Sequence, residues 1–253
     1  MKKKPLKLSV RIALGFVLPI IILILWYLSG KLQWVNQAIL PSVYNTFRAA
    51  KKLIMDGTLA ENILVSIGRV LKGFLLGASL GIVIGIAMGL SRVVYSLLQS
   101  IVGTFRPIPM IAWIPLFILW IGIGDELKVA VIALGSFWSV LLNTIHGIQS
   151  VDPKLLEVAT ALEKSKWVVL RQIILPSALP SVITGIRLGM GSAWACVVAA
   201  EMIAASKGIG YMIMFAREMA QPAKLMVGIF SIGLVGLLID TIILKLQKRL
   251  IRW

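Results

Sequence analysis

Long uncharged runs alternate along the chain with short segments that carry most of the charged residues. Apolar runs of about 18 residues or more are typical of helices that cross a lipid bilayer. The pattern predicts an all-α integral membrane protein whose residues 1–253 form a single transmembrane domain. The expected membrane-spanning helices are residues 10–29, 64–90, 99–121, 128–149, 177–202 and 224–245.

The first run follows a basic segment that begins Met1-Lys2-Lys3-Lys4, as in a secretory signal peptide. No small-x-small cleavage site follows it, and Trp26-Tyr27 is typical of an aromatic anchor at the membrane surface. We therefore expect an uncleaved first span. Residues 42–56 interleave apolar and basic side chains, which predicts a short helix lying on the outer membrane surface.

Composition supports a membrane protein, because 59% of the residues are hydrophobic and only 14% are charged. These values exclude a soluble globular domain and a disordered chain. The net charge of +16 would suggest nucleic-acid binding in a soluble protein, but here basic residues flank the spans. The segments on the N-terminal side carry 14 Lys and Arg, against 8 on the opposite side. The positive-inside bias predicts cytoplasmic termini at both ends and no nucleic-acid partner.

The second span contains a glycine at every fourth position, which places the glycines on one helix face. Such a stripe lets two helix backbones approach closely, either within one chain or between two chains. Its members are Gly73, Gly77, Gly81, Gly85 and Gly89.

The segment 150–176 differs from the other connections because it mixes charged residues with leucine, valine and tryptophan. Asp152-Pro153 is a favourable helix start, with aspartate as the cap and proline in the first turn. We expect helices over residues 153–163 and 165–174, the second ending before Leu175-Pro176. An amphipathic helical hairpin on the cytoplasmic face indicates a docking surface for another protein.

The residues Glu157-Val158-Ala159 and Ile173-x-Leu175-Pro176 resemble the EAA loop of bacterial ABC importer permeases. That pattern is E-A-A, three residues, a glycine, nine residues and I-x-L-P, and the spacing in this chain fits throughout. Two residues depart from it, since Val158 replaces the first alanine and Glu163 replaces the glycine. Further stretches are similar to the nitrate/sulfonate/taurine type, among them Arg106–Pro109, Ala112–Leu116, Trp120–Gly124, Ala199–Met202 and Gly208–Tyr211.

The resemblance implies a permease with the type I ABC importer fold in the bacterial cytoplasmic (inner) membrane. It implies a homodimer that works with two cytoplasmic ATPase subunits and an external solute-binding protein. ATP and Mg would be bound by the ATPases, so no cofactor is expected in this chain. The coupling residues would be Glu157, Val158, Ala159, Glu163, Ile173, Leu175 and Pro176. The solute would be an anion such as a sulfonate, taurine or nitrate, although some relatives carry pyrimidine precursors or vitamin-like molecules.

The residues themselves offer no sign of catalysis. The phosphate-binding pattern G-x-x-x-x-G-K-[ST] does not occur, and nothing resembles a nucleophile paired with a base. His146 has no cysteine or carboxylate at metal-ligand spacing, so no metal site is expected. The lone cysteine, Cys196, is interpreted as a small packing residue. We therefore expect a transporter and not an enzyme.

Charged residues within membrane spans are functional candidates because they are costly to place there. Arg106, Arg187 and Glu201 are such residues, while Asp240 is expected near a membrane surface. Arg187 alternatively reaches the headgroups along its aliphatic stem. Pro107 and Pro109 disrupt helical hydrogen bonding beside Arg106, and a break there could line a cavity. Trp113 and Trp194 could flank a solute path or simply pack against other helices.

Two other classes of membrane protein remain as alternatives. An ion-coupled secondary transporter needs membrane-buried carboxylates, and only Glu201 comes close. A membrane-embedded enzyme needs a polar catalytic cluster in the spans, and the sequence contains none.

Overall fold

The computed structural model describes residues 8–250, and every regular element in that range is a helix. Residues 1–7 and 251–253 lie outside it, including the predicted basic flank at Lys2–Lys4. The helices are α1 (Leu8–Leu32), α2 (Val43–Met55), α3 (Thr58–Leu90), α4 (Arg92–Phe105), α5 (Met110–Ile121), α6 (Asp125–Gln149), α7 (Pro153–Ala161), α8 (Lys166–Val169), a π-helical segment η1 (Leu170–Ile174), α9 (Leu175–Ala204), α10 (Ile209–Glu218) and α11 (Pro222–Leu250).

Five helical segments are long and apolar enough to cross a membrane, and a bent pair makes a sixth candidate. The five are α1, α3, α6, the continuous α8–η1–α9 helix and α11. This result confirms the all-α membrane class predicted from the sequence. Helices α1, α3, α6 and α11 begin two to six residues before the predicted spans, because the polar ends of the helices continue beyond the apolar runs.

The span expected over residues 99–121 is interrupted at the prolines that the sequence marked as disrupting helical hydrogen bonding. Helix α4 ends at Phe105, α5 begins at Met110, and their axes differ by 99°. Pro107 and Pro109 lack backbone N–H donors and disfavour helical geometry in the residues before them, which accounts for the break. Pro115, by contrast, is accommodated inside α5.

The predicted helix end before Leu175-Pro176 is also wrong, because the helix continues without interruption from Lys166 to Ala204. The turns from Leu170 to Ile174 are π-helical. In π-helical turns each N–H bonds to the carbonyl five residues earlier instead of four. This shift of the hydrogen-bond register lets the helix continue although Pro176 has no backbone N–H to donate. The second arm of the predicted hairpin is therefore the start of the fifth spanning segment.

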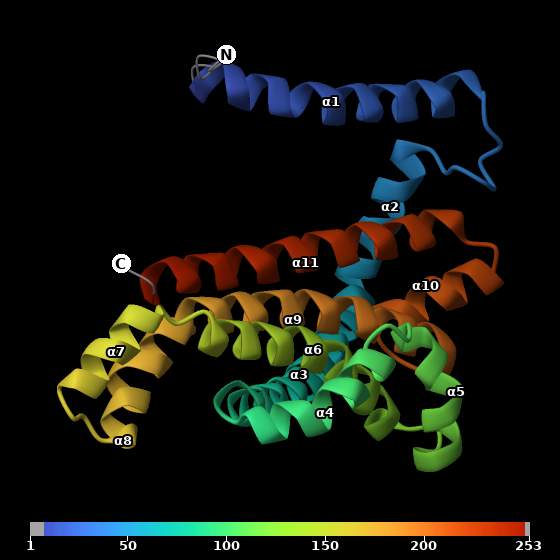
Figure 1. Ribbon diagram of the computed structural model, residues 1–253. Helices are drawn as coiled ribbons and strands as arrows, with labels where there is room; N and C mark the ends of the chain where they lie inside the picture. Colours follow the sequence, from blue (N-terminus) through green and yellow to red (C-terminus); the bar gives the residue numbers. More distant parts are fainter. Residues whose placement is uncertain (1–7, 251–253) are drawn as a thin grey trace. The chain divides into compact units, whose positions relative to one another are not determined.

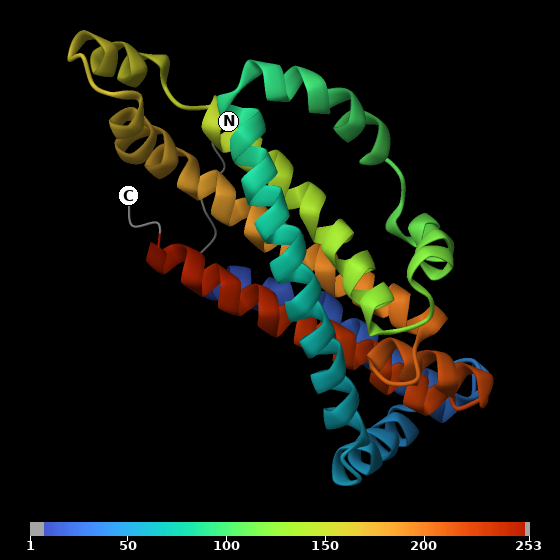
Figure 2. The ribbon, with the colours of Figure 1, turned by 90° about the horizontal axis from the view of Figure 1, so that it is seen from below.

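The chain forms two compact units. The larger unit consists of Ala60–Tyr211 and the chain from Ser231 onward. In it α6 lies between α9 and α3, and each of these two helices runs beside it. Figures 1 and 2 show α6 beside α9. Ile132, Val140, Leu141 and Val197 are fully buried between these helices.

The glycine stripe of α3 faces α6 of the same chain. A Cβ atom at Gly73 would lie 2.6 Å from Ile132 Cβ, and one at Gly85 would lie 2.7 Å from Thr144 Cβ. At Gly77 it would overlap the carbonyl oxygen of Ala133. Gly81 and Gly89 meet α6 in the same way further along the helix. The stripe thus serves helix packing within one chain.

The smaller unit contains the described residues up to Leu59 together with Met212–Phe230. Trp26 of α1 donates its Nε1–H to the carbonyl of Pro41 at 2.9 Å. The hydroxyl of Ser42 then caps α2 by accepting from the Asn45 N–H. Helix α2 (Val43–Met55) confirms the short helix predicted over residues 42–56.

Candidate functional site

The segment 150–176, called the hairpin loop below, joins α6 to α9. Its first arm, α7, starts where predicted, because the Asp152 carboxylate accepts from the Lys154 N–H at 2.9 Å and Pro153 occupies the first turn. Its second arm is α8 with η1. In Figures 1 and 2 both arms extend beyond the ends of α6 and α9.

The turn between the arms places Glu163 in a left-handed conformation, with φ of 49°. The Glu163 N–H donates to the Thr160 carbonyl, and the Lys164 N–H donates to the Ala159 carbonyl. These two bonds form a Schellman motif, which usually has glycine at the left-handed position. Glu163 therefore keeps the backbone turn that a glycine would give, at the energetic cost of a Cβ atom.

The outer surface of the hairpin loop carries exposed apolar side chains among its charged residues. Val158 is 58% exposed, Trp167 is 65% exposed, and Leu155 and Leu162 are also exposed. Ala159 is the buried member of the Glu157-Val158-Ala159 triplet. A cavity of about 490 Å³ opens between the arms, with Leu156, Thr160, Lys164, Lys166, Val169, Leu170 and Ile174 among its lining residues.

The remaining motif residues continue this surface onto the long helix. Ile173 lies in η1 and is partly buried, whereas Leu175 and Pro176 begin α9 and are exposed. Glu157 is exposed as well, and no cation of the described residues lies within ion-pair distance of it. The hairpin loop therefore presents apolar side chains together with an unpaired carboxylate.

A polar cluster occupies the opposite end of α6 and α9. Its centre is Glu201, which is 1% exposed. Both carboxylate oxygens accept from the Ser66 hydroxyl, at 2.9 and 2.8 Å, and Oε1 also accepts from Arg69 Nη1 at 2.8 Å. The Gly210 N–H donates to Oε2 at 3.0 Å. The buried charge is thus paired and hydrogen-bonded, as a buried carboxylate requires.

Arg69 connects this carboxylate to the start of α6. Its Nε and Nη2 donate to Asp125 Oδ1 at 3.0 and 2.8 Å, and its Nη1 donates to the carbonyl of Lys207. The Lys128 ammonium, itself nearly buried, lies 3.6 Å from the same Asp125 oxygen. Arg69, Asp125 and Lys128 border a cavity of about 660 Å³.

The connection between α9 and α10 is fixed to α3 by backbone hydrogen bonds. The Gly208 N–H donates to the Asn62 side-chain oxygen at 2.7 Å, and the Ile209 N–H donates to the Ser66 hydroxyl at 2.9 Å. Gly208 has φ of 116°, and a Cβ there would overlap the Glu201 carboxylate. Only glycine satisfies both conditions.

The other predicted pathway residues lie elsewhere in the larger unit. Arg187 donates from Nε and Nη2 to the two carboxylate oxygens of Asp240, at 2.7 and 2.8 Å. Trp194 is buried, and its Nε1–H donates to the carbonyl of Ile232 at 3.1 Å. Both contacts join α9 to α11. The structure therefore places Arg187 and Trp194 in helix packing contacts.

Arg106 and Trp113 lie at or beside the break between α4 and α5. Arg106 is exposed, and Trp113 packs between Phe105 and Phe117 with ring centroids 5.8 and 6.1 Å away. The structure does not bring these two residues together with Arg187, Trp194 and Glu201. Within the described residues, no three His, Cys, Asp or Glu side chains gather as a metal site.

Sequence reasoning missed Arg69, the partner of Glu201. The signal was present, because Ser66 and Arg69 are polar residues three positions apart within an apolar helix, on one face. A charge so placed needs a partner from another helix. The same reasoning requires a partner for Glu201, which the structure supplies.

Comparison with known proteins gives a consistent result. Residues 62–252 match the family model described as the binding-protein-dependent transport system inner membrane component. A Bacillus subtilis protein named as an aliphatic sulfonates transport permease is 40% identical over 252 residues, which cover 100% of this chain and 91% of the relative. The Escherichia coli taurine transport system permease protein is 34% identical, covering 98% and 92%.

Relatives of lower sequence identity belong to the same class of transport protein. The nitrate import permease protein of Synechocystis is 30% identical over 98% of this chain and 93% of its own length. Among solved structures, an amino acid ABC transporter crystallised with histidines has a TM-score of 0.66 at 14% identity, covering 79% of this chain and 97% of the other. At that identity the likeness concerns the fold alone.

Proposed function

Because this chain belongs to the binding-protein-dependent family of inner-membrane transport permeases, we propose that it conducts a small solute with an anionic oxygen group, such as an aliphatic sulfonate, taurine or nitrate, into the cell. Permeases of this family work with ATPase subunits and a binding protein. Support for an anion comes from relatives of nearly full length that are named for sulfonates, taurine and nitrate. Uptake of a pyrimidine precursor or a vitamin-like solute instead would overturn this choice.

The proposed assembly contains two copies of this chain, two ATPase subunits and one external binding protein. ATP and Mg would bind to the ATPases, so the permease contributes a conduit and a mechanical linkage. The bias of Lys and Arg between the two sides supports cytoplasmic termini. With six spans, this orientation puts the hairpin loop in the cytoplasm and the polar cluster at the outer end.

The observation that carries the coupling proposal is the apolar surface of the hairpin loop. Val158, Leu162 and Trp167 are each more than half exposed on this loop. Large apolar side chains that meet water mark a site of protein association. We assign the ATPase to this surface, with Glu157 facing a basic residue of the ATPase.

Movement of the docked loop would be transmitted directly to a membrane-spanning helix. The second arm continues without a break into α9, so displacement of α8 moves the same helix that carries Glu201 at its other end. ATP-driven approach of the two ATPases would therefore tilt α9 and change access to the solute path.

The coupling proposal is tested with Glu157→Lys in proteoliposomes that contain the ATPase and the binding protein. We expect the variant to assemble in the membrane but to lose solute-stimulated ATP hydrolysis and uptake. Glu218→Lys is the matched control, because Glu218 is also an exposed helical glutamate and lies outside the hairpin loop. Normal coupling in Glu157→Lys, or equal loss in both variants, would contradict the docking assignment.

A further inference from the structure

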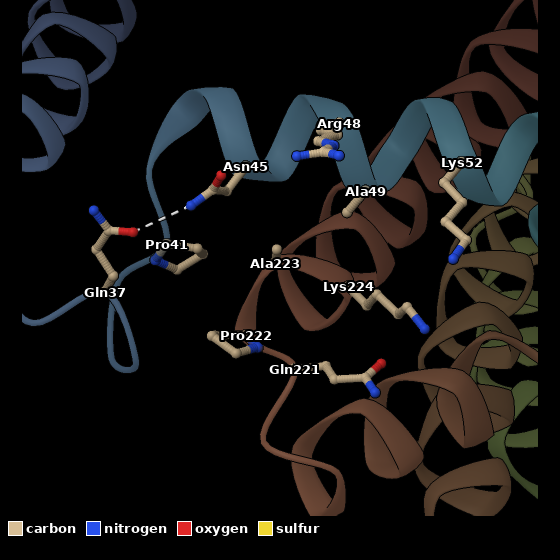
Figure 3. Close-up of a pocket in the computed structure, with 10 residues that line it drawn as sticks. All are labelled: Gln37, Pro41, Asn45, Arg48, Ala49, Lys52, Gln221, Pro222, Ala223 and Lys224. Atoms are coloured by element: carbon tan, nitrogen blue, oxygen red, sulfur yellow. Dashed lines mark hydrogen bonds between the residues drawn. The ribbon is translucent and has the colours of Figure 1, made fainter.

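A cationic pocket in the smaller unit has no role in the function proposed above. It has a volume of about 500 Å³ and lies between one face of α2 and the start of α11 (Figure 3). Asn45, Arg48, Ala49 and Lys52 recur at helical spacing and form the α2 wall. The other lining residues are Gln37, Pro41, Gln221, Pro222, Ala223 and Lys224.

Three of the lining residues are cations, and no acid lines the pocket. Among the described residues, no carboxylate lies within ion-pair distance of Arg48, Lys52 or Lys224. Figure 3 shows Lys52 and Lys224 extending into the space between α2 and α11. Like charges that share a cavity repel one another, and a bound anion relieves that repulsion.

Asp56 interacts electrostatically with Lys52 and Lys224, but its carboxylate already accepts a hydrogen bond within its own turn. Asp56 Oδ1 accepts from the Thr58 N–H at 3.0 Å. The Thr58 amide and hydroxyl, and to a smaller degree Lys52 and Lys224, hold the pKa of Asp56 below its ordinary value. Asp56 does not line the pocket, so its charge leaves the pocket itself positive.

Neutral hydrogen-bond donors also favour an anion in this pocket. Gln221 has a buried side-chain oxygen without a hydrogen-bond partner. The oxygen and nitrogen of a side-chain amide exchange places on rotation, so the amide can turn an N–H toward a bound anion. The first turn of the 29-residue helix α11 also lines the pocket, and N-terminal helix N–H groups favour anions.

The remaining walls are apolar, formed by Pro41, Ala49, Pro222 and Ala223. Such walls suit a ligand with an apolar body behind its charged group. We propose that this pocket binds a tetrahedral oxyanion, sulfonate or phosphate, that carries a short apolar substituent. Two sources supply this chemistry: a free alkanesulfonate and the headgroup of an anionic phospholipid. The choice of sulfonate as the first probe rests on the proposed function.

The test measures binding to the purified permease in nanodiscs of phosphatidylcholine, by equilibrium dialysis with radiolabelled propanesulfonate. A charge about 4 Å from the anion in water-like surroundings contributes about fivefold to affinity, so Lys52→Gln with Lys224→Gln should raise Kd about 25-fold. Lys52→Arg with Lys224→Arg should retain binding. Lys51→Gln is the matched control, because Lys51 is an exposed neighbour on α2 that does not line the pocket.

A second arm uses nanodiscs that contain phosphatidylglycerol, with native mass spectrometry to count retained lipid. Lipid retention that falls in the double glutamine variant, without sulfonate binding, supports the pocket and identifies the headgroup as the source. Absence of both signals, or equal loss in Lys51→Gln, overturns the proposal. Uptake of sulfonate is measured separately in proteoliposomes. Transport of sulfonate without any binding in the pocket would contradict only the proposal for the pocket. Binding in the pocket without transport would contradict only the proposed function.

Discussion

The polar cluster and the hairpin loop lie at opposite ends of α6 and α9, and they differ in whether their groups find partners within the chain. In the polar cluster, Glu201 is buried and accepts hydrogen bonds from Ser66, Arg69 and Gly210. In the hairpin loop, Val158 and Trp167 face outward. The first region satisfies its polar groups within one chain. The second leaves large apolar side chains exposed, as expected of the proposed docking surface for the ATPase.

The largest effect on stability is expected when Arg69 loses its charge in the polar cluster. Arg69→Met leaves Glu201 buried without its counter-charge, and breaking a buried pair in this way costs about 3–5 kcal/mol. We expect a large loss of folded protein, seen as a lower melting temperature in detergent. Lys207→Met is the control, because its pair with Glu61 is exposed and surface pairs contribute about 0–1 kcal/mol. Equal stability of the two variants would show that the cluster is not structural.

A smaller effect is expected at the contact between α3 and α6. Gly77→Ala places a Cβ atom against the Ala133 carbonyl oxygen, and overpacking of this kind costs about 1–3 kcal/mol. Gly68→Ala changes the same helix where a Cβ atom meets nothing within 4 Å. Thermal unfolding should therefore shift downward for Gly77→Ala and not for Gly68→Ala. A shift of the same size in both would mean that the stripe does not pack as described.

The smallest change in stability is expected in the hairpin loop. Replacing glutamate by glycine there should stabilise the loop at one position and destabilise it at another. Glu163→Gly removes the strain of a left-handed glutamate and should stabilise the turn by about 1 kcal/mol. Glu157→Gly lies inside α7 and should destabilise that helix by about 1 kcal/mol. Hydrogen exchange of the α7 amides measures both changes. Slower exchange in Glu157→Gly than in Glu163→Gly would contradict the turn geometry.

Much of the fold follows from the sequence because lipid imposes a simple length rule on apolar helices. The runs that became α1, α3, α6 and α11 are plain in the hydropathy pattern, and Asp152-Pro153 marks the start of α7. The continuous helix through Pro176 was not predictable in the same way. Proline usually ends a helix, and the π-helical turns that accommodate it depend on the local backbone and not on apolar spacing.

Site residues could be predicted where they belong to one short sequence pattern. They could not be predicted where they depend on contacts between helices that are distant in the sequence. Glu157 and Pro176 belong to one short pattern and could be found together. Glu201 was a candidate because of its charge, but its link to Arg69 joins residues 132 positions apart. Trp194 and Arg187 were pathway candidates on composition, and only the fold shows that they contact α11.

Cysteine labelling at the two ends of the larger unit shows directly whether the hairpin loop faces the ATPase. Val158→Cys and Ile123→Cys, each made in a Cys196→Ala background, place one exposed thiol in the hairpin loop or beside the polar cluster. With the ATPase present at about ten times its Kd, maleimide labelling of the Val158→Cys thiol should slow about tenfold, because only the unbound fraction reacts. Labelling of the Ile123→Cys thiol should not change. Protection of the Ile123→Cys thiol alone, or of neither thiol, would contradict the assignment of the hairpin loop as the surface that faces the ATPase.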